Sequence, residues 1–408
     1  MRLALLKVIF SRRMLVAGIM GFSAGLPLLL TISLLQARMK REGIDLTVIG
    51  LMALVGLPYT LKFVWAPILD RYAIPLLGRR RGWLLTSQIL LMLAIIGLGV
   101  THPVPNTWVV ALAALGVTFF SASQDIVIDA YRREDLADEE LGLGSSLYVS
   151  GYRLGMWVAG GGGFILADRF SFATVYFIMA CCLLPGVLTT LLTPEPDAPF
   201  GLPRTMQEAV IEPFKEYFSR QGAWWILAFI LLYKIGDTMA SAMTTPFYLD
   251  MGFSMTEIGA VVKTFGAGAI IVGGLIGGLF MIRLGINRSL WVFGLLQAVS
   301  TAGFVVLAQR GHSLSVLTAV IAFENLSAGM GTSAYAAFMA SITHQKFTAT
   351  QYALLSSLMG IPRVIAASGT GFMAKQMGWY GFFIACTLVA IPGMLLLLKF
   401  APWRTPKS

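Results

Sequence analysis

Two aspartates, Asp125 and Asp129, follow an unbroken apolar run over residues 108–120 and lie one helical turn apart. A helix through this stretch places Gln124 on the same side as both carboxylates, with Ser121 one turn before Asp125. Charged groups are costly in an apolar interior unless they are paired. Within a membrane, acidic side chains that face a polar cavity are typical of proton and solute pathways. The stretch therefore predicts an acidic helix face beside a water-filled path.

The composition is that of a membrane protein. Of the 408 residues, 57% are hydrophobic and 12% are charged, with a mean hydropathy of +0.77. Soluble proteins carry about 25% charged residues, and apolar stretches of about 20 residues, enough for a membrane-crossing helix, recur along the whole chain. We predict an all-α membrane protein with twelve transmembrane helices. The expected spans are residues 14–37, 45–69, 82–101, 107–131, 145–168, 172–192, 222–249, 256–282, 288–308, 313–341, 350–374 and 379–400.

The basic residues indicate how the chain is oriented in the membrane. Most lysines and arginines outside the expected spans fall on one side, including the run Arg79–Arg81 and the pair Arg132–Arg133. The positive-inside rule then predicts that both termini are cytoplasmic. The net charge of +10 reflects this topology, so no nucleic-acid partner is expected. Arg12 and Arg13 precede a run of full spanning length, so we expect no cleavable signal peptide.

No residue pattern predicts a metal site, a cofactor or a catalytic centre. The cysteines lie in apolar segments without a CxxC pair, and the histidines lie near span ends without the spacing of metal ligands. The polar residues are spread over many spans and do not form a nucleophile–base pair. A membrane enzyme is therefore the weaker interpretation.

The two halves of the chain repeat one another. The segment Gly43–Gly50 reappears as Gly252–Gly259, and Arg153, after a Ser-Ser pair, is matched by Arg363 at a similar offset. Because each half holds six spans, both have the same orientation, which resembles the parallel-repeat arrangement of the major facilitator fold. The expected parts are an N-terminal six-helix bundle over residues 1–193, a cytoplasmic linker over 194–221 and a C-terminal six-helix bundle over 222–408, with the bundles related by a pseudo-two-fold axis.

A basic loop follows the second expected span. Asp70 and Arg71, followed by Gly78-Arg-Arg-Arg-Gly82, resemble the G-x-x-x-D-R-x-G-R-R/K loop of facilitators, although the first glycine is replaced and the spacer is longer. We predict a gating latch on the cytoplasmic face made by Asp70, Arg71, Arg79 and Arg80. The alternative is that the arginines only anchor the loop by the positive-inside rule.

Nine charged residues lie inside the expected spans, at least two residues from either end. The cations are Lys62, Arg153, Lys234, Lys263 and Arg363, and the anions are Asp125, Asp129, Asp237 and Glu324. Each costs about 2.5–3.5 kcal/mol at a helix centre, so they must face a cavity, the bundle interior or one another. Basic side chains match carboxylates on a solute. The set therefore predicts a polar chamber for a large, negatively charged substrate, with Ser121, Gln124 and Asn325 as further lining residues.

Several roles remain open among these residues. Asp125 is the deeper acid on its helix and our favoured proton site, whereas Asp129 either shares that role or only pairs with Arg132 and Arg133. Glu324, beside Asn325, is a further candidate for proton coupling. Two pairs have structural alternatives: Lys234 and Asp237 are spaced to pair along their own helix, and Arg153 and Arg363 could brace neighbouring spans.

Six segments together resemble a specific family, the AmpG-type muropeptide permeases. They are Gly21–Pro27, Gly43–Gly50, Lys62–Pro67 with Asp70–Tyr72, Gly78–Leu84, Ser121–Val127 with Asp129, and Gly151–Gly155. The motifs cover the N-terminal half densely, and the second half is similar in layout. Some family members are longer, whereas this sequence ends soon after Trp403.

The resemblance implies a proton-driven importer in the inner membrane of a Gram-negative bacterium. Such permeases carry N-acetylglucosaminyl-1,6-anhydro-N-acetylmuramyl peptides from periplasm to cytoplasm for peptidoglycan recycling, and their activity feeds the signal that induces β-lactamase. The positions that it implicates are Lys62, Gln124, Asp125, Asp129, Tyr152 and Arg153. No cofactor is implied, and a monomer in the lipid bilayer is expected.

Two other functions fit the same charges. A related branch of the family transports acetyl-CoA, which is also a bulky anion. A sensor that binds muropeptide without moving it would share the cavity but would not need a titrating acid.

Overall fold

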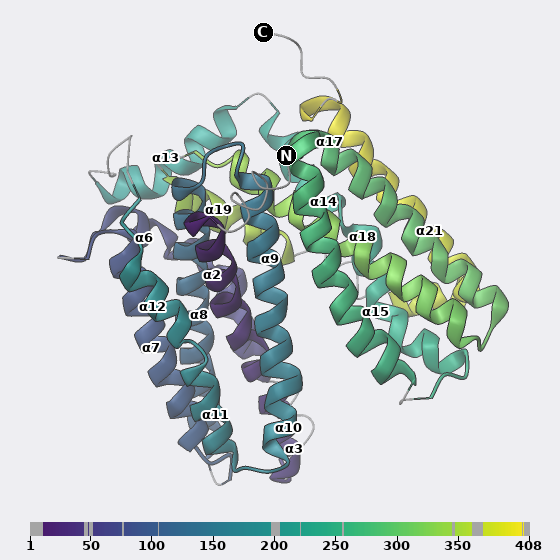
Figure 1. Cartoon of the computed structure of the whole chain (residues 1–408), viewed down its shortest axis with the longest axis horizontal. Helices are drawn as coiled ribbons and strands as arrows, with labels where there is room; N and C mark the ends of the chain where they lie inside the picture. Colours follow the sequence, from purple (N-terminus) through teal and green to yellow (C-terminus); the bar gives the residue numbers. More distant parts are fainter. Residues whose placement is uncertain are drawn as a thin grey trace. The chain divides into compact units, whose positions relative to one another are not determined.

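The structure is a computed structural model that describes residues 11–44, 48, 52–75, 77–104, 106–196, 205–220, 222–254, 257–344, 347–360, 370–401 and 403 (Figure 1). Among these residues all regular elements are helical, and the extended backbone is limited to one isolated bridge between Ile74 and Gly78. The prediction of an all-α chain is confirmed.

The chain forms two compact units. Unit 1 comprises Met1–Ala137, Leu147–Phe214 and Ile342–Ser357, and unit 2 comprises Asp138–Ser146, Lys215–Ser341 and Leu358–Ser408. Each unit thus contains one short segment from the opposite half of the chain. The boundaries at residues 193 and 222 expected from the sequence remain a prediction.

Unit 1 is built on a group of long helices running side by side (Figure 1). Helix α7 packs against α8, α11 and α12, and α2 packs against α8. The elements that it holds wholly or in part are α2 (Arg12–Leu29), η1 (Leu30–Leu34), α3 (Leu35–Arg41), η2 (Met52–Gly56), α5 (Leu57–Leu61), η3 (Lys62–Val64), α6 (Ala66–Arg71), α7 (Arg80–Val100), α8 (Thr107–Asp135), α9 (Leu141–Trp157), η4 (Val158–Gly162), α10 (Gly163–Ala167), α11 (Phe172–Cys181), α12 (Leu184–Leu192), α13 (Met206–Ser219) and α19 (Thr348–Leu358).

Unit 2 is dominated by the packing of α17 on α18 and of α21 on α15 and α17. Its elements are α14 (Ala223–Leu232), α15 (Ile235–Asp250), η5 (Ile258–Phe265), α17 (Gly266–Arg310), α18 (Leu314–Ser341) and α21 (Thr370–Phe400). Helix α17 turns at Gly285, where φ is +74°, and α21 turns at Gly378, where φ is +64°. Glycine adopts such backbone angles without the clash of a Cβ atom, so one helix ends and the next begins at each of these two positions. The helices before and after Gly285 in α17 match the two spans expected at 256–282 and 288–308.

Eight helices among the described residues are long and apolar enough to cross a membrane. They correspond to nine of the twelve expected spans, because one of them, Ile258–Arg310, covers both 256–282 and 288–308. The other three spans consist of shorter pieces. Residues 52–71 form η2, α5, η3 and α6, residues 141–167 form α9, η4 and α10, and α19 begins the span expected at 350–374, of which residues 361–369 lie outside the described part.

Helices α2 and α9 approach very closely because glycines line their contact. A Cβ atom on Gly21 or Gly25 would collide with the backbone of Tyr148 or Tyr152. Small residues let helix backbones approach in this way within a membrane. The contact holds the part of α9 that carries Tyr148 and Tyr152 against α2.

Candidate functional site

The acidic face of α8 is buried within unit 1. Relative exposure is 0% for Ser121 and Gln124, 7% for Asp125 and 4% for Asp129. Tyr59 of α5 donates a hydrogen bond to Ser121 Oγ at 2.9 Å, and Gln124 Nε2 donates to the carbonyl oxygen of Ser23 on α2 at 3.0 Å. The face is therefore clamped between α2 and the short helices of residues 52–71.

Lys62 is brought to this face by a break in its own span. It begins the 3-10 turn η3, and Pro67 occupies the first turn of the following helix α6. Proline lacks an N–H, so Pro67 cannot continue the hydrogen-bond pattern of the preceding turn, and the span restarts as α6 instead of continuing as one α-helix. Lys62 is 7% exposed, and its Nζ lies 3.9 Å from Asp129 Oδ2.

Asp125 lies beside this ion pair with an incompletely satisfied carboxylate. Its Oδ1 atom is buried and has no hydrogen-bond partner among the described residues. A buried carboxylate oxygen without a partner is unfavourable when charged. Such a group is suited to binding a proton or a hydrogen-bond donor of a ligand. Proton binding is the role that the sequence predicts for Asp125.

Asp129 has a second cationic neighbour on its own helix. Nη2 of Arg132 lies 3.2 Å from Asp129 Oδ1. The pairing that the sequence left open for Asp129 therefore exists, and Lys62 shares the same carboxylate. Arg132 also donates to the hydroxyl of Tyr352 on α19 at 2.8 Å. The sequence predicted neither Tyr59 nor Tyr352 as a neighbour of the α8 polar face.

Tyr152 and Arg153 lie on α9 in the same unit. The ring of Tyr152 is 6.2 Å from that of Tyr148, and Tyr148 lies over the guanidinium of Arg132. Arg153 is half-buried. Tyr152 thus neighbours the α8 cluster through Tyr148, while the bracing role of Arg153 remains a prediction.

The expected residues of unit 2 form two separate groups. Lys234 Nζ lies 3.8 Å from Asp237 Oδ2 and donates to Thr332 Oγ1 at 2.7 Å. The alternative pairing of Lys234 with Asp237 is therefore present, although Lys234 lies at the N-cap of α15 and not within the same helix. Asn325 Nδ2 donates to Glu324 Oε2 at 2.8 Å and to the carbonyl oxygen of Ile321 at 3.0 Å.

Of the two remaining cations expected at the site, Lys263 joins neither group. Lys263 is exposed on η5, and Arg363 lies outside the described residues.

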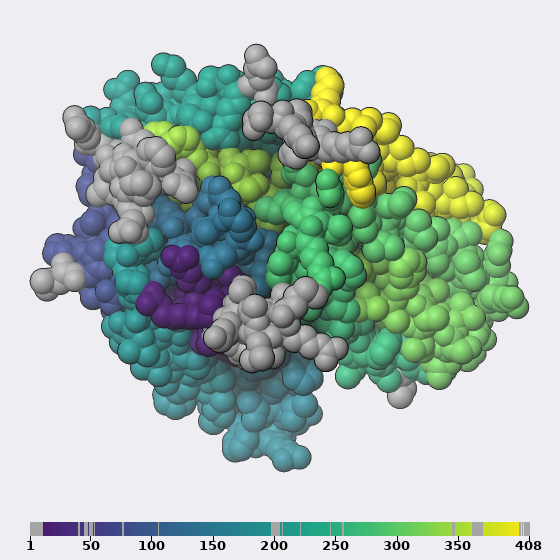
Figure 2. Space-filling view, turned by 45° about the horizontal axis from the view of Figure 1, so that its top comes forward, coloured from purple at the N-terminus to yellow at the C-terminus, as the bar shows by residue number. Residues whose placement is uncertain are grey.

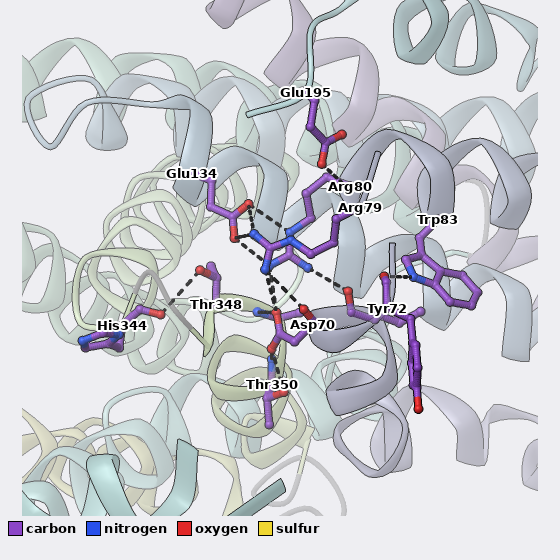
Figure 3. A network of polar contacts seen from close by, with 12 residues as sticks. Asp70, Tyr72, Arg79, Arg80, Trp83, Glu134, Glu195, His344, Thr348 and Thr350 are labelled. Atoms are coloured by element: carbon purple, nitrogen blue, oxygen red, sulfur yellow. Dashed lines mark hydrogen bonds and ion pairs between the residues drawn. The ribbon is translucent and has the colours of Figure 1, made fainter. Parts of the chain in front are cut away.

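The loop after residue 69 forms a buried ionic network (Figure 3). Asp70 is fully buried, and Nη2 of Arg80 donates to Asp70 Oδ1 at 2.8 Å. The carboxylate also accepts from the backbone N–H groups of Ala349 at 3.2 Å and Thr350 at 2.8 Å, and from Thr350 Oγ1 at 2.7 Å. Asp70 therefore caps the first turn of α19, where backbone N–H groups lack helical partners.

Two glutamates complete the network and were not predicted from the sequence. Glu134, near the end of α8, accepts hydrogen bonds from Arg79 at 3.1 Å and from Arg80 at 2.6 Å. Glu195 accepts from the backbone N–H groups of Arg80 at 2.6 Å and Arg81 at 2.9 Å, where a carboxylate is favoured by the dipole at the start of α7. Glu134 directly follows Arg132 and Arg133 at the end of the helix, and nothing in that sequence pattern indicates that its carboxylate is buried.

Three of the four expected gating residues therefore converge. Arg79 lies 3.9 Å from Asp70 Oδ1, and burial together with the neighbouring Arg80 lowers the pKa of Arg79. Arg71 is not brought into this network, because its guanidinium lies over the ring of Tyr72, 5.0 Å from the centroid.

Within the described residues, no group of three or more histidine, cysteine, aspartate or glutamate side chains is arranged to hold a metal ion.

Comparison with known proteins places these features in a family. The family model of the Major Facilitator Superfamily matches residues 14–367. The anhydromuropeptide permease of Escherichia coli K12 is 44% identical over 396 residues, covering 96% of this chain and 80% of that protein. A protein of Rickettsia conorii that carries the name AmpG 4 is 31% identical over 403 residues, covering 96% of this chain and 97% of the relative.

A solved structure supports the fold independently. A variant of the Escherichia coli fucose:proton symporter FucP superposes with a TM-score of 0.74 at 12% identity, covering 98% of this chain and 100% of that one. The chain therefore belongs to the major facilitator superfamily. Within it, the chain is a member of the AmpG-type permeases, and the predicted fold class is confirmed.

Proposed function

We propose that the protein is a proton-coupled importer of anhydromuropeptides. The substrate class, N-acetylglucosaminyl-1,6-anhydro-N-acetylmuramic acid with or without its peptide, is supported by the similarity to the anhydromuropeptide permease of Escherichia coli. The direction is from periplasm to cytoplasm across the inner membrane, by a monomer with both termini cytoplasmic. Import of this kind would serve peptidoglycan recycling and supply the signal for β-lactamase induction.

The observation that carries the proton part of the proposal is the unsatisfied carboxylate of Asp125. It lies on the buried face of α8 next to the ion pair of Lys62 and Asp129, which are 3.9 Å apart. Two carboxylates and two cations, Lys62 and Arg132, then balance one another when both acids are ionised. Uptake of one proton by Asp125 leaves the cluster with one net positive charge.

That positive charge matches the substrate. A muropeptide carries carboxylates on its lactyl ether or its peptide, and basic side chains bind carboxylates with charge-assisted hydrogen bonds. Protonation of Asp125 would thus favour loading, and release of the proton would favour unloading. This linkage between proton and anionic solute is the physical basis of symport.

The other site residues have assigned roles in the proposal. Substrate contacts come from Lys62, Ser121, Gln124, Tyr152 and Arg153 in unit 1, and from Lys234, Asp237, Lys263, Asn325 and Arg363 in the second half of the chain. Glu324 and Asp129 are the additional acids, and Asp70 with its arginines is the gate. The buried, fully paired network at Asp70 supports the gate, because separating such pairs is costly and must be driven.

Transport in proteoliposomes tests the proposal. Purified protein is expected to concentrate labelled disaccharide-peptide inside vesicles when an inward pH gradient is applied, and excess unlabelled substrate should compete. Saturable binding without accumulation would favour the sensor, and competition by acetyl-CoA but not by muropeptide would favour the acetyl-CoA transporter.

A further inference from the structure

One guanidinium joins the acidic face of α8 to the segment that the second half of the chain contributes to unit 1. Arg132 follows Asp129 by one turn on α8, and Tyr352 lies on α19; both side chains are 3% exposed. Nη2 of Arg132 lies 3.2 Å from Asp129 Oδ1 and 2.8 Å from Tyr352 Oη. This nitrogen carries two hydrogens, so it donates to the carboxylate and to the hydroxyl at once.

The other two nitrogens of Arg132 do not fix its orientation. Nε and Nη1 are buried and have no acceptor among the described residues. The guanidinium carbon lies over the rings of Tyr148 and Tyr352, 4.2 Å and 5.5 Å from their centroids. Ring faces attract a cation but offer it no directional acceptor like a carboxylate. The direction of the guanidinium is therefore set by the two acceptors of Nη2, and Asp129 is the charged one of the two.

The carboxylate of Asp129 is itself divided between two cations. Its Oδ2 faces Lys62 at 3.9 Å while its Oδ1 faces Arg132. The charged and titratable groups around this point are Asp125 and Asp129 on α8, Lys62 on η3, Tyr148 on α9 and Tyr352 on α19. Loss of charge at Asp129 removes the anionic acceptor of Arg132 and so weakens the contacts that keep Nη2 beside Tyr352.

Helix α19 is attached to the N-terminal helices of unit 1 at a second point. Its first turn is capped by Asp70 through Ala349 and Thr350. On the surface of the molecule, the yellow-green α19 lies between the teal α13 and the blue N-terminal helices (Figure 2), and Gln351 donates to the carbonyl oxygen of Pro213 in α13 at 3.0 Å. The contact through Tyr352 differs from these two contacts because Arg132 connects it to Asp129, an acid on the buried face of α8.

We infer that Arg132 and Tyr352 are positioning residues that couple the charge of Asp129 to the attachment of α19. The inference rests on the proposed proton-driven transport, in which Asp129 is an additional acid. It extends that proposal by naming the contacts through which the charge of Asp129 acts on α19. Ionised Asp129 binds the guanidinium of Arg132, and the guanidinium binds Tyr352 near the start of α19. Neutral Asp129 releases the guanidinium and weakens the attachment.

Hydrogen–deuterium exchange of the α19 backbone amides tests this coupling without substrate. Tyr352→Phe keeps the ring and removes the acceptor hydroxyl, and Asp129→Asn keeps the side-chain size and removes the charge. Each variant, in nanodiscs, is expected to speed exchange over residues 348–358 by roughly tenfold, as for the loss of one charge-assisted hydrogen bond. The double variant is expected to exchange no faster than either single variant, because both remove the same connection.

Two further variants serve as controls. Tyr148→Phe removes a hydroxyl beside the same guanidinium without touching the bridge, and is expected to leave α19 exchange unchanged. Thr350→Val weakens the independent Asp70 attachment, so its effect is expected to multiply with that of Tyr352→Phe.

The coupling is overturned if Asp129→Asn leaves α19 exchange unchanged, or if its effect multiplies with that of Tyr352→Phe. Should Asp129→Asn fail to fold, Arg132→Lys replaces it, because lysine keeps the charge but not the guanidinium geometry; independence of Arg132→Lys and Tyr352→Phe would equally contradict the coupling. Failure of muropeptide uptake with this exchange pattern intact would refute the proposed transport alone.

Discussion

At the scale of single residues, Asp125 and its neighbours are the candidates for proton coupling. The carboxylate lies on a buried helix face, with one oxygen that lacks a partner among the described residues and an ion pair of Lys62 and Asp129 beside it. Asp129 and Arg132 already have a paired arrangement. Asp125 is thus the acid whose proton can be exchanged with the least disturbance of existing contacts.

Replacing Asp125 by asparagine is expected to separate proton coupling from substrate movement. Asp125→Asn keeps the shape but cannot cycle a proton, so accumulation driven by a pH gradient should fall to the level of protein-free vesicles. Counterflow exchange of labelled for unlabelled substrate should remain measurable, since it requires no net proton transfer. The matched control is Asp168→Asn, because Asp168 is exposed at the end of α10. Accumulation like that of the wild type at neutral pH would rule out the proton role of Asp125.

Lys62 is expected to distinguish substrates by their peptide carboxylates. Lys62→Ala removes one cation, and a charge-assisted hydrogen bond contributes about 1.5–3 kcal/mol, so half-saturation for the disaccharide-peptide should rise by roughly tenfold or more. The bare disaccharide should be affected less. Arg363 lies outside the described residues, and Arg363→Ala is expected to have the same effect as Lys62→Ala. The control is Lys375→Ala, which removes an exposed lysine and should leave half-saturation unchanged. Equal losses on both substrates would show that Lys62 supports the fold instead of the peptide.

At the scale of elements, buried charges are paired again in the network at the start of α7. Arg79 and Arg80 are held by Asp70 and Glu134, whose side chains are 0% and 2% exposed. The carboxylates of Asp70 and Glu134 balance the two guanidinium groups, and all four side chains are almost fully buried. The network joins α6, α7, α8 and α19 into one block.

Glu134→Gln is expected to weaken this block strongly. It leaves two buried guanidinium groups with one carboxylate, and breaking a buried ion pair costs about 3–5 kcal/mol. Thermal unfolding in detergent should therefore show a clearly lower midpoint for unit 1. Glu139→Gln, at an exposed glutamate in the next loop, provides the comparison. Similar midpoints for the two variants would mean that Glu134 contributes nothing to holding the block.

The start of η5 offers a pH-dependent test of a helix cap. Ser254 N–H and Oγ donate to Glu257 Oε2 at 2.8 Å and 2.9 Å, and Glu257 N–H returns a bond to Ser254 Oγ at 3.2 Å, the reciprocal pattern of a capping box. These bonds, together with His312 at 3.3 Å, lower the pKa of Glu257. The stabilisation is therefore present above the unfolded-state pKa and is lost as pH falls through the lower folded-state pKa.

The unfolding midpoints of the wild type and Glu257→Gln should follow this sign. At pH 7 the wild type is expected to unfold at the higher temperature, and the difference should shrink as pH is lowered below about 4.3, the ordinary pKa of glutamate. A difference that persisted unchanged at the lowest pH would contradict a contribution from the ionised cap.

Across the whole molecule, the sequence predicted the spans well because a spanning helix needs only a sufficient apolar length. The breaks inside spans were harder to predict: Pro67 and the 3-10 turn at Lys62 interrupt a run that hydropathy alone treats as continuous. Asp125 and Asp129 stood out because an acid is rare within an apolar span, and Asp70 stood out because it begins the basic loop that resembles the facilitator motif. Glu134 and Tyr352 did not, since their partners lie 54 and 220 residues away in sequence and only folding brings them together.

The whole-molecule claim is that inward movement of a muropeptide carries protons with it. Its most direct test records external pH and labelled substrate together, on proteoliposomes without an imposed gradient. Adding N-acetylglucosaminyl-1,6-anhydro-N-acetylmuramyl peptide to wild-type vesicles is expected to raise the external pH while label enters, and the Asp125→Asn vesicles should show no pH change. Entry of label into wild-type vesicles with no change in external pH would contradict proton-coupled import.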